Sequence, residues 1–418
     1  MAPTDRTVDD GPTGVTGQDA KIIGLIAGGH FFSHFYLLTL PPLFLFIQKD
    51  FGVSYVALGL AMTAYNLIGG IIQAPVGFLV DRFGARHLLL AGFGLNALAV
   101  ALMGVADAYW MLLVLAVLAG IGNSVFHPAD YAIMSGAISE KRVGRAFGLH
   151  TFSGFLGGSV APLAMGGMAA FWGWRTALLV AGGAGLVTLA VMALNSDILD
   201  RAAPGKGTPP PQHPVERAVR QGWSLLLTPA MLVFFGLFCA ITFTTSGIFA
   251  FTINGLMELH DTPYAIANIA LTGFLFASSF GVLLGGFLAD RVGRHDLIAS
   301  CALVIAAVSI LMPAFFDLSP AALIAVLCLS GLAFGNVQPA RDMMVRAITP
   351  PGEMGKVFGF LSVGMSVGAS IAPLMFGLFM DGGRPDWIFL GAAVFMMVTL
   401  VAALAGRFVG VRSGLRRS

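Results

Sequence analysis

Two histidines near the start of the chain, His30 and His34, stand four residues apart in a long apolar stretch. A helix places residues at that spacing on one face. A second apolar stretch carries Asn123, His127 and Asp130 at the same helical rhythm, so these side chains also share a face. Imidazole exchanges a proton near neutral pH, and ionisable groups in apolar segments are commonly functional. The pattern predicts proton handling or the binding of a small polar molecule.

Other polar side chains in apolar stretches extend this set. The candidates for substrate or proton binding are His30, His34, Asn123, His127, Asp130, Tyr131, Thr245, Gln338 and Arg341. For each imidazole, including that of His150, the structural alternative is a hydrogen bond to a neighbouring helix. His30 and His34 also have a spacing that suits a metal ion, but such a site needs further ligands, so we predict no metal there. The cysteines Cys239, Cys301 and Cys328 have neither metal nor redox spacing.

The segments that carry these residues are suited to a lipid bilayer. Of the 418 residues, 57% are hydrophobic and 11% are charged, whereas a soluble domain carries about 25% charged residues. The apolar segments are about 20–28 residues long, enough for a helix to cross a hydrocarbon core of about 30 Å. We therefore expect an all-α membrane protein, and the net charge of +2 suggests no nucleic-acid partner.

Twelve transmembrane helices are expected, six on either side of a polar linker. The predicted spans are 22–47, 55–80, 87–106, 109–136, 146–170, 175–194, 225–256, 264–289, 296–316, 319–347, 355–380 and 386–409. The predicted domains are a disordered N-terminal tail at 1–20, six-helix halves at 21–194 and 223–409, a linker at 195–222 and a basic tail at 410–418.

Lysine and arginine are shared unequally between the two ends of the spans. Of the 23 such residues, twenty lie at the end that carries the chain termini and the linker. The other three are Lys49, Arg175 and Arg384. Because basic residues concentrate on the cytoplasmic side, both termini are predicted to be cytoplasmic. The first twenty residues lack a signal-peptide pattern, and we expect a multi-pass protein of a bacterial inner membrane.

The two halves repeat each other in sequence. Gly-Phe-Leu-Val-Asp-Arg-Phe-Gly at 77–84 returns as Gly-Phe-Leu-Ala-Asp-Arg-Val-Gly at 286–293. His-Pro-Ala at 127–129 returns as Gln-Pro-Ala at 338–340. Internal duplication of this kind places a substrate site at the interface of the repeats in many transporters.

With these motifs the chain resembles the major facilitator superfamily over residues 21–409. The resemblance implies two pseudo-symmetric six-helix halves that transport a small molecule by alternating access, usually as a monomer. It also implies that Asp81 and Arg82 join a cytoplasmic charge network that latches the halves in the outward-open state. The predicted gate residues are Asp81, Arg82, Arg86, Asp290, Arg291 and Arg294. Ala85 departs from the family pattern, and a tight cytoplasmic turn is the alternative reading of these charges.

Polar side chains concentrate in the first, fourth, seventh and tenth spans, which are therefore expected to line an aqueous cavity. Asp130 and Arg341 are equivalent positions of the repeat. We predict that they form an ion pair between the halves that breaks when the carrier opens inward. In the alternative, Asp130 pairs within its own half and Arg341 pairs with Asp342 or with lipid phosphate.

The sequence favours a proton-coupled symporter of a small polar or anionic organic metabolite, with the proton as coupling ion and no cofactor. The alternative is a proton-coupled drug or antibiotic efflux antiporter, because the segments at 29–34 and 126–128 resemble the fosmidomycin-resistance group. The fifth span departs from the antiporter motif at Ala161. A membrane sensor that does not transport is a third possibility. No nucleophile with a neighbouring base is visible, so an enzyme is not expected.

Overall fold

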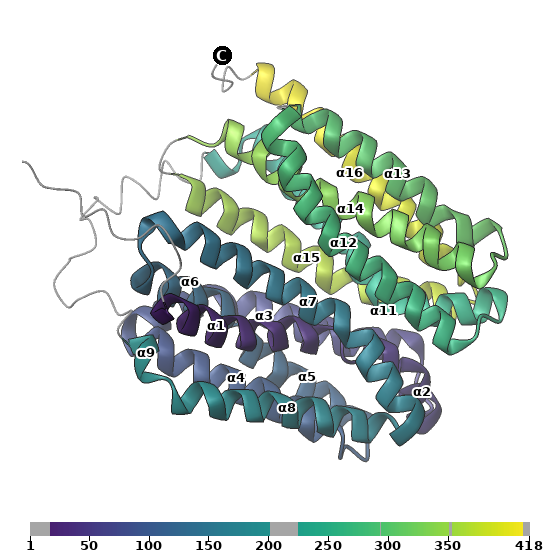
Figure 1. The fold of residues 1–418 in the computed structure, drawn as a ribbon. Coiled ribbons are helices and arrows are strands. Elements are labelled where there is room, and N and C mark those ends of the chain that lie inside the picture. Colours follow the sequence, from purple (N-terminus) through teal and green to yellow (C-terminus); the bar gives the residue numbers. More distant parts are fainter. Residues whose placement is uncertain (1–16, 201–224, 293, 351–352, 413–418) are drawn as a thin grey trace, which may run out of the picture.

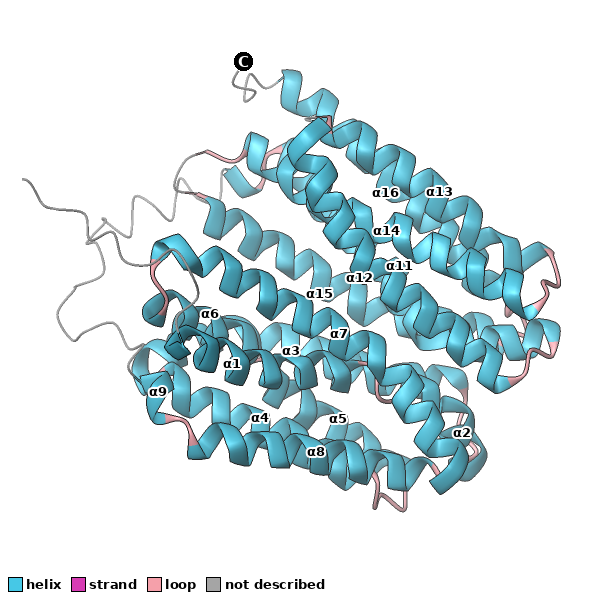
Figure 2. Ribbon diagram, viewed as in Figure 1, coloured by secondary structure: helices cyan, strands magenta, loops and turns pink. Residues whose placement is uncertain are grey.

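The computed structural model describes residues 17–412 apart from 201–224, 293 and 351–352. Within these residues the chain is helical, with no strand (Figure 2). Two bundles lie side by side, one running from purple to teal and the other from green to yellow (Figure 1). The end of the bundle where α1 begins and α16 ends is here called the termini side, and the opposite end is called the far side.

The first bundle contains the helices that precede the linker. They are α1 (Gly17–Leu37), η1 (Pro41–Leu43), α2 (Phe44–Phe51), α3 (Tyr55–Phe83), α4 (Ala85–Met103), α5 (Tyr109–Asn123), α6 (Phe126–Ala137), α7 (Glu140–Trp172), α8 (Trp174–Leu194) and the short α9 (Asp197–Asp200). The second bundle is built from long single helices. They are α11 (Pro229–His260), α12 (Tyr264–Val292), α13 (His295–Phe315), α14 (Pro320–Ile348), α15 (Met354–Asp381) and α16 (Asp386–Arg412).

The first span is not the single helix that the sequence predicted. Helix α1 ends at Leu37, and the chain bends by 40° before it continues through η1 and α2. Pro41 and Pro42 lie in this break, and a proline cannot donate the backbone hydrogen bond that would continue the helix. Within the described residues, eleven further apolar spans and this bent span give the twelve spans that the sequence predicts.

The fourth span is also interrupted, between α5 and α6. Ser124 and Val125 separate the two helices at the middle of the span. Pro128 follows in the first turn of α6 and supplies no N–H to the carbonyl of Ser124. The break therefore lies beside the residues that carry the candidate chemistry, Asn123 and His127.

The predicted disordered tail at 1–20 is wrong at its last residues. Helix α1 begins at Gly17, and Asp19 is buried, with its carboxylate 2.8 Å from Nε of Arg142 on α7. This ion pair connects the start of α1 to α7. Residues 1–16 lie outside the described residues, as does most of the predicted linker.

Equivalent glycines pack the two halves in the same way. A methyl group added at Gly120 of α5 would come within 2.4 Å of the Tyr65 carbonyl oxygen of α3. At Gly331 of α14 the corresponding distance to the Phe274 carbonyl oxygen of α12 is 2.1 Å. Small residues let helices in lipid approach closely. These matched contacts join the second and fourth spans of each half, α3 with α5 and α12 with α14, and they agree with the sequence duplication.

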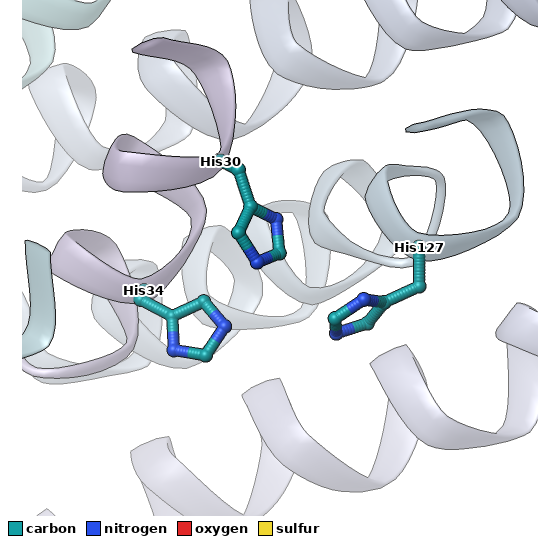
Figure 3. Close-up of side chains that lie close together, drawn as sticks. All are labelled: His30, His34 and His127. Carbon is teal, nitrogen blue, oxygen red and sulfur yellow. The ribbon is translucent and has the colours of Figure 1, made fainter. Parts of the chain in front are cut away.

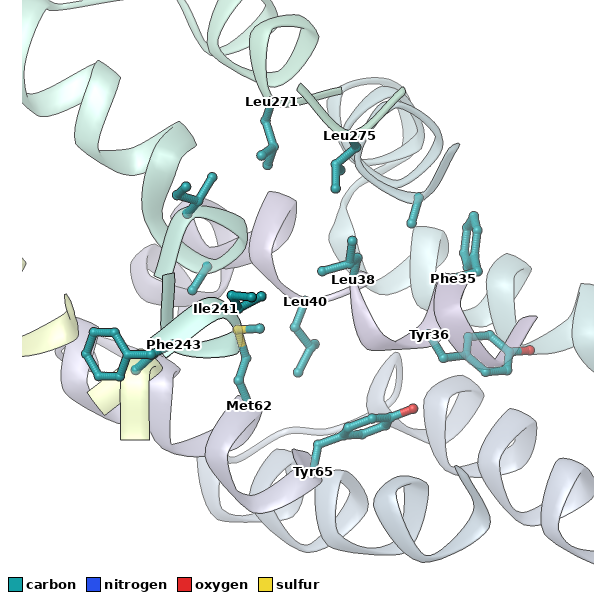
Figure 4. Packing of buried hydrophobic residues seen from close by; sticks show 14 of the residues in the cluster. Phe35, Tyr36, Leu38, Leu40, Met62, Tyr65, Ile241, Phe243, Leu271 and Leu275 are labelled. Carbon is teal, nitrogen blue, oxygen red and sulfur yellow. The ribbon is translucent and has the colours of Figure 1, made fainter. Parts of the chain in front are cut away.

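The hydrophobic core continues from one half into the other. Figure 4 places Leu38, Leu40 and Met62 of the first half close to Ile241 and Leu275 of the second. These side chains are buried, so the halves meet through packed apolar surface as well as through polar contacts.

Polar contacts between the halves gather toward the far side. The Asp381 carboxylate of α15 accepts hydrogen bonds from the backbone N–H groups of Tyr55, at 2.7 Å, and Val56, at 2.9 Å. The Tyr55 hydroxyl donates to Glu258 of α11, and the Asn268 amide donates to the Pro162 carbonyl at 2.9 Å. These bonds hold the far ends of the halves together.

Candidate functional site

A cavity of about 250 Å³ lies between the two halves. Both halves contribute polar side chains to it. The polar residues on its wall are Ser33, His34, Tyr65, Asn66, Gln73, Asn123, Ser124, His127, Thr242, Thr245, Ser246 and Ser366. A volume of this size and a wall of hydroxyl, amide and imidazole groups suit a small polar molecule.

The helices around this cavity differ in part from those predicted. The first, fourth and seventh spans line it as expected, through α1, α5, α6 and α11. Among the described residues the tenth span, α14, contributes nothing to the wall, and α3 and α15 take its place. Gly331 and Gly335 hold α14 against the backbone of α12.

Three histidines from two helices converge on the cavity. His30 and His34 come from α1 and His127 from α6, and each turns a ring nitrogen toward the space between them (Figure 3). The ring centroid of His30 lies 4.8 Å from that of His34 and 5.1 Å from that of His127. Gly154 of α7 makes room for this arrangement, since a methyl group there would lie 2.9 Å from the rings of His30 and His34.

A buried carboxylate lies behind the histidines. Oδ2 of Asp130 is 2.9 Å from Nε2 of His150 and 3.3 Å from Nδ1 of His30. The rings of His30 and His150 stack with centroids 3.6 Å apart. All three side chains are buried, and a carboxylate inside a membrane span needs such partners to offset the loss of water. The structure thus gives His150, a minor candidate in the sequence, a central position. Asp130, His30 and His150 are here called the Asp130 cluster.

Asn123 is held at the wall of the cavity by two other residues. Its Oδ1 accepts hydrogen bonds from Ser33 Oγ at 2.8 Å and from Asn96 Nδ2 at 3.2 Å. Both bonds use the oxygen and Asn123 lines the cavity, so its amide N–H₂ group is available to donate to a bound molecule. Asn96 lies on α4, in a span for which the sequence predicted few interior polar groups, and no spacing rule linked it to Asn123.

The seventh span contributes hydroxyl groups from the opposite half. Thr242 donates to the Met365 carbonyl of α15 at 2.9 Å, and Thr245 donates to the Ile241 carbonyl of its own helix at 3.2 Å. Their oxygens remain able to accept further hydrogen bonds. Tyr131 lies beside the cluster, with its ring 5.8 Å from that of His127, and its side chain is exposed.

The predicted ion pair between Asp130 and Arg341 is not formed in this conformation. Asp130 is paired within its own half, and Nε of Arg341 is 3.0 Å from Oδ1 of Asp342. The Arg341 guanidinium also lies 4.0 Å from the ring centroid of Phe238 on α11, an arrangement that favours a cation. Gln338 is half-buried on α14 and does not line the cavity.

The gate residues lie on the termini side. Asp81 and Arg82 are exposed and, among the described residues, form no ion pair. Arg86 is 3.6 Å from Asp197, and Arg291 lies 3.9 Å from the ring centroid of Phe287. Arg294 is exposed just before α13, and the side chain of Asp290 lies outside the described part of the chain. The latch between the halves stays a prediction for another conformation.

Comparison with known proteins identifies the family. The model of the Major Facilitator Superfamily matches residues 26–256 and 233–414, which together span nearly the whole chain. The chain belongs to the major facilitator superfamily. Its twelve spans, its duplicated halves and its central cavity between them are those of a membrane transport protein rather than an enzyme.

Two curated relatives come from Escherichia coli. The fosmidomycin resistance protein of strain K12 is 25% identical over 299 residues, 70% of each chain. The D-galactonate transporter of strain O6:H1 is 24% identical over 389 residues, 86% of this chain and 88% of the relative. Among solved structures, a bacterial homologue of the human lysosomal transporter Spinster, inward-facing and unoccupied, is 16% identical. It aligns with a TM-score of 0.78 over 97% of this chain and 100% of its own, which supports the fold.

Proposed function

We propose that this transporter is a proton-coupled symporter for a small polar or anionic organic metabolite. The observation that carries the proposal is the polar cavity between the halves with the Asp130 cluster directly behind it. Asn123 and His127 on one wall and Thr245 on the other supply the hydrogen bonds that hold the cargo. The cavity volume limits the cargo to a small molecule.

The coupling proton is assigned to Asp130 and its histidine partners. A carboxylate that is buried inside a membrane span is stable only when it is neutral or paired with a cation, so its proton depends on the surrounding contacts. His34 and His127 line the cavity and also contact the His30 ring. A cargo molecule in the cavity would therefore contact the same imidazoles that lie against the proton-binding cluster.

Arg341 takes part when the conformation changes. In the present conformation it is paired with Asp342, and its Nη1 is buried with no hydrogen-bond partner among the described residues. When the termini side closes, we expect Arg341 to approach Asp130, and Asp81 and Arg82 to form the latch. The excess of basic residues supports a cytoplasmic position for the termini side in a bacterial cell. The proposed working unit is a single chain.

The test is the lumenal pH of dye-loaded proteoliposomes to which small carboxylates, phosphonates, amino acids and cationic drugs are added outside. Acidification that requires the protein is expected with one class of small anion or polar metabolite. Alkalinisation would instead establish exchange of a proton for the added compound. Uptake of one of these compounds without any change in lumenal pH, with protein that is folded and inserted, would contradict proton coupling.

The alternative function is the exchange of a proton for an exported drug or antibiotic, because one relative is named a fosmidomycin resistance protein. On that reading the same cavity exports a small anionic antibiotic while protons enter. The two functions share the cavity and the Asp130 cluster and differ in the sign of the lumenal pH change, so the same assay separates them.

A further inference from the structure

We propose that His30, His34 and His127 form a binding site for a divalent transition-metal ion of the zinc class. The sequence offered only the pair on α1, which is too few ligands for a site. The fold brings in a third imidazole from α6, at the break between α5 and α6. One nitrogen from each of the three rings lies within 4.8 Å of the others.

Small side-chain movements would close this site around an ion. Zinc binds imidazole nitrogen at about 2.0–2.1 Å, so the nitrogens of a tetrahedral site are about 3.3 Å apart. Because the nitrogens are at most 4.8 Å apart, they would have to approach one another by at most about 1.5 Å to reach that separation. Nitrogens of all three rings already point into one space (Figure 3).

The surroundings of His30 match those of a metal ligand. A histidine that binds a metal usually turns its other ring nitrogen toward a carboxylate, which fixes the ring and strengthens the ligand. Nδ1 of His30 faces Oδ2 of Asp130 at 3.3 Å, which leaves Nε2 for an ion. The buried negative charge of Asp130 would also offset part of the ion's positive charge.

The cavity provides access to this site. His34 and His127 are half-buried and line the cavity, while His30 is buried behind them. Three protein ligands leave a fourth position on a tetrahedral ion, and that position is reached from the cavity. A second triad, His30, Asp130 and His150, also has suitable spacing, but it is fully buried and Asp130 is already hydrogen-bonded to His150. We therefore place the ion among the three histidines.

The test is Co²⁺ binding by the detergent-purified full-length protein with an affinity tag that contains no histidine. We expect one ion per chain, with the strong visible absorption of tetrahedral Co²⁺, and displacement of that ion by Zn²⁺. Pulsed electron paramagnetic resonance of bound Cu²⁺ counts the imidazole ligands directly in the wild-type protein, and three are expected. Failure of folded wild-type protein to bind one ion per chain, or fewer than three imidazoles on Cu²⁺, would overturn the proposal.

Substitutions assign the ligands. His34→Gln and His127→Gln should each weaken Co²⁺ binding at least tenfold, and Asp130→Asn should weaken it by about 10–100-fold because it supports a ligand. His87→Gln is the matched control, since His87 is exposed at the start of α4, and binding should be unchanged. Wild-type affinity in folded His34→Gln and His127→Gln would refute the assignment.

The proposed ion site and the proposed transport reaction are tested separately. Ion binding is measured in detergent without any transport, so a failure of proton coupling leaves it unaffected. Absence of the ion would likewise leave the lumenal pH assay to decide the transport function.

Discussion

At the scale of single residues, Asp130 organises the polar interior of the first half. Its carboxylate approaches His30 on α1 and His150 on α7, so it joins three helices through two contacts. Removing one partner from a buried ion pair is costly, about 3–5 kcal/mol, because the remaining charge has no solvent. The contacts with Asp130 therefore fix the His30 ring, against which the rings of His34 and His127 lie.

Asn123→Ala should weaken binding of the transported compound about tenfold or more. The substitution removes an amide N–H₂ group that faces the cavity, and a lost hydrogen bond of this kind is worth about 1–3 kcal/mol. The measurement is the KM of uptake for the compound that the lumenal pH assay identifies. Asn195→Ala, at the exposed end of α8, is the control, and an equal KM in Asn123→Ala and wild type would exclude Asn123 from the cargo site.

At the scale of elements, the helices are positioned by close contacts at glycine. The backbone of α12 passes so near Gly331 that a side chain at this position of α14 would displace one of the helices. Gly120 of α5 makes the equivalent contact with the backbone of α3, so the second and fourth spans pack in the same way in each half.

Gly331→Ala should therefore destabilise the protein by about 1–3 kcal/mol, the usual cost of overpacking. The added methyl group would lie 2.1 Å from the Phe274 carbonyl oxygen, which belongs to the backbone and cannot rotate away. Thermal unfolding in detergent measures the change. Gly286→Ala on α12 is the control because that position has open space, and equal melting temperatures for both variants would contradict the packing argument.

Much of this arrangement follows from the sequence, and the rest depends on contacts that no spacing reveals. Hydropathy and the repeat predicted twelve spans in two halves, and helical spacing predicted that His34, Asn123 and His127 would face the cavity. The role of His150 was underestimated because its partner, Asp130, lies twenty residues away on another helix. The contact of Arg341 with Phe238 likewise depends on how α14 lies beside α11, whereas its pairing with Asp342 is the alternative that the sequence offered.

At the scale of the whole molecule, the halves are joined toward the far side. Asp381 binds the first N–H groups of α3, where the helix dipole favours a negative charge. Tyr55 reaches Glu258 from the same turn. Alternating access requires these bonds to break while the halves close on the termini side.

Asp381→Ala should shift the transporter toward conformations that are open on the far side, because it removes both acceptors at the start of α3. Spin labels at Val53→Cys and Thr262→Cys, on opposite halves, report the opening in a background without native cysteines. We expect Asp381→Ala to increase the population in which the distance between the two spin labels is longer. Asp386→Asn is the control, since Asp386 pairs within its own half with Arg384. An unchanged distance distribution in Asp381→Ala would show that Asp381 does not hold the far side closed.

The central claim is that the Asp130 cluster couples a proton to the cargo in the cavity between the halves. The most direct measurement compares lumenal pH in proteoliposomes of the wild type, Asp130→Asn and the exposed control Asp107→Asn during addition of the transported compound. We predict acidification with wild type and Asp107→Asn, and none with Asp130→Asn, which still exchanges labelled for unlabelled compound. Acidification of equal size in folded Asp130→Asn would contradict the claim.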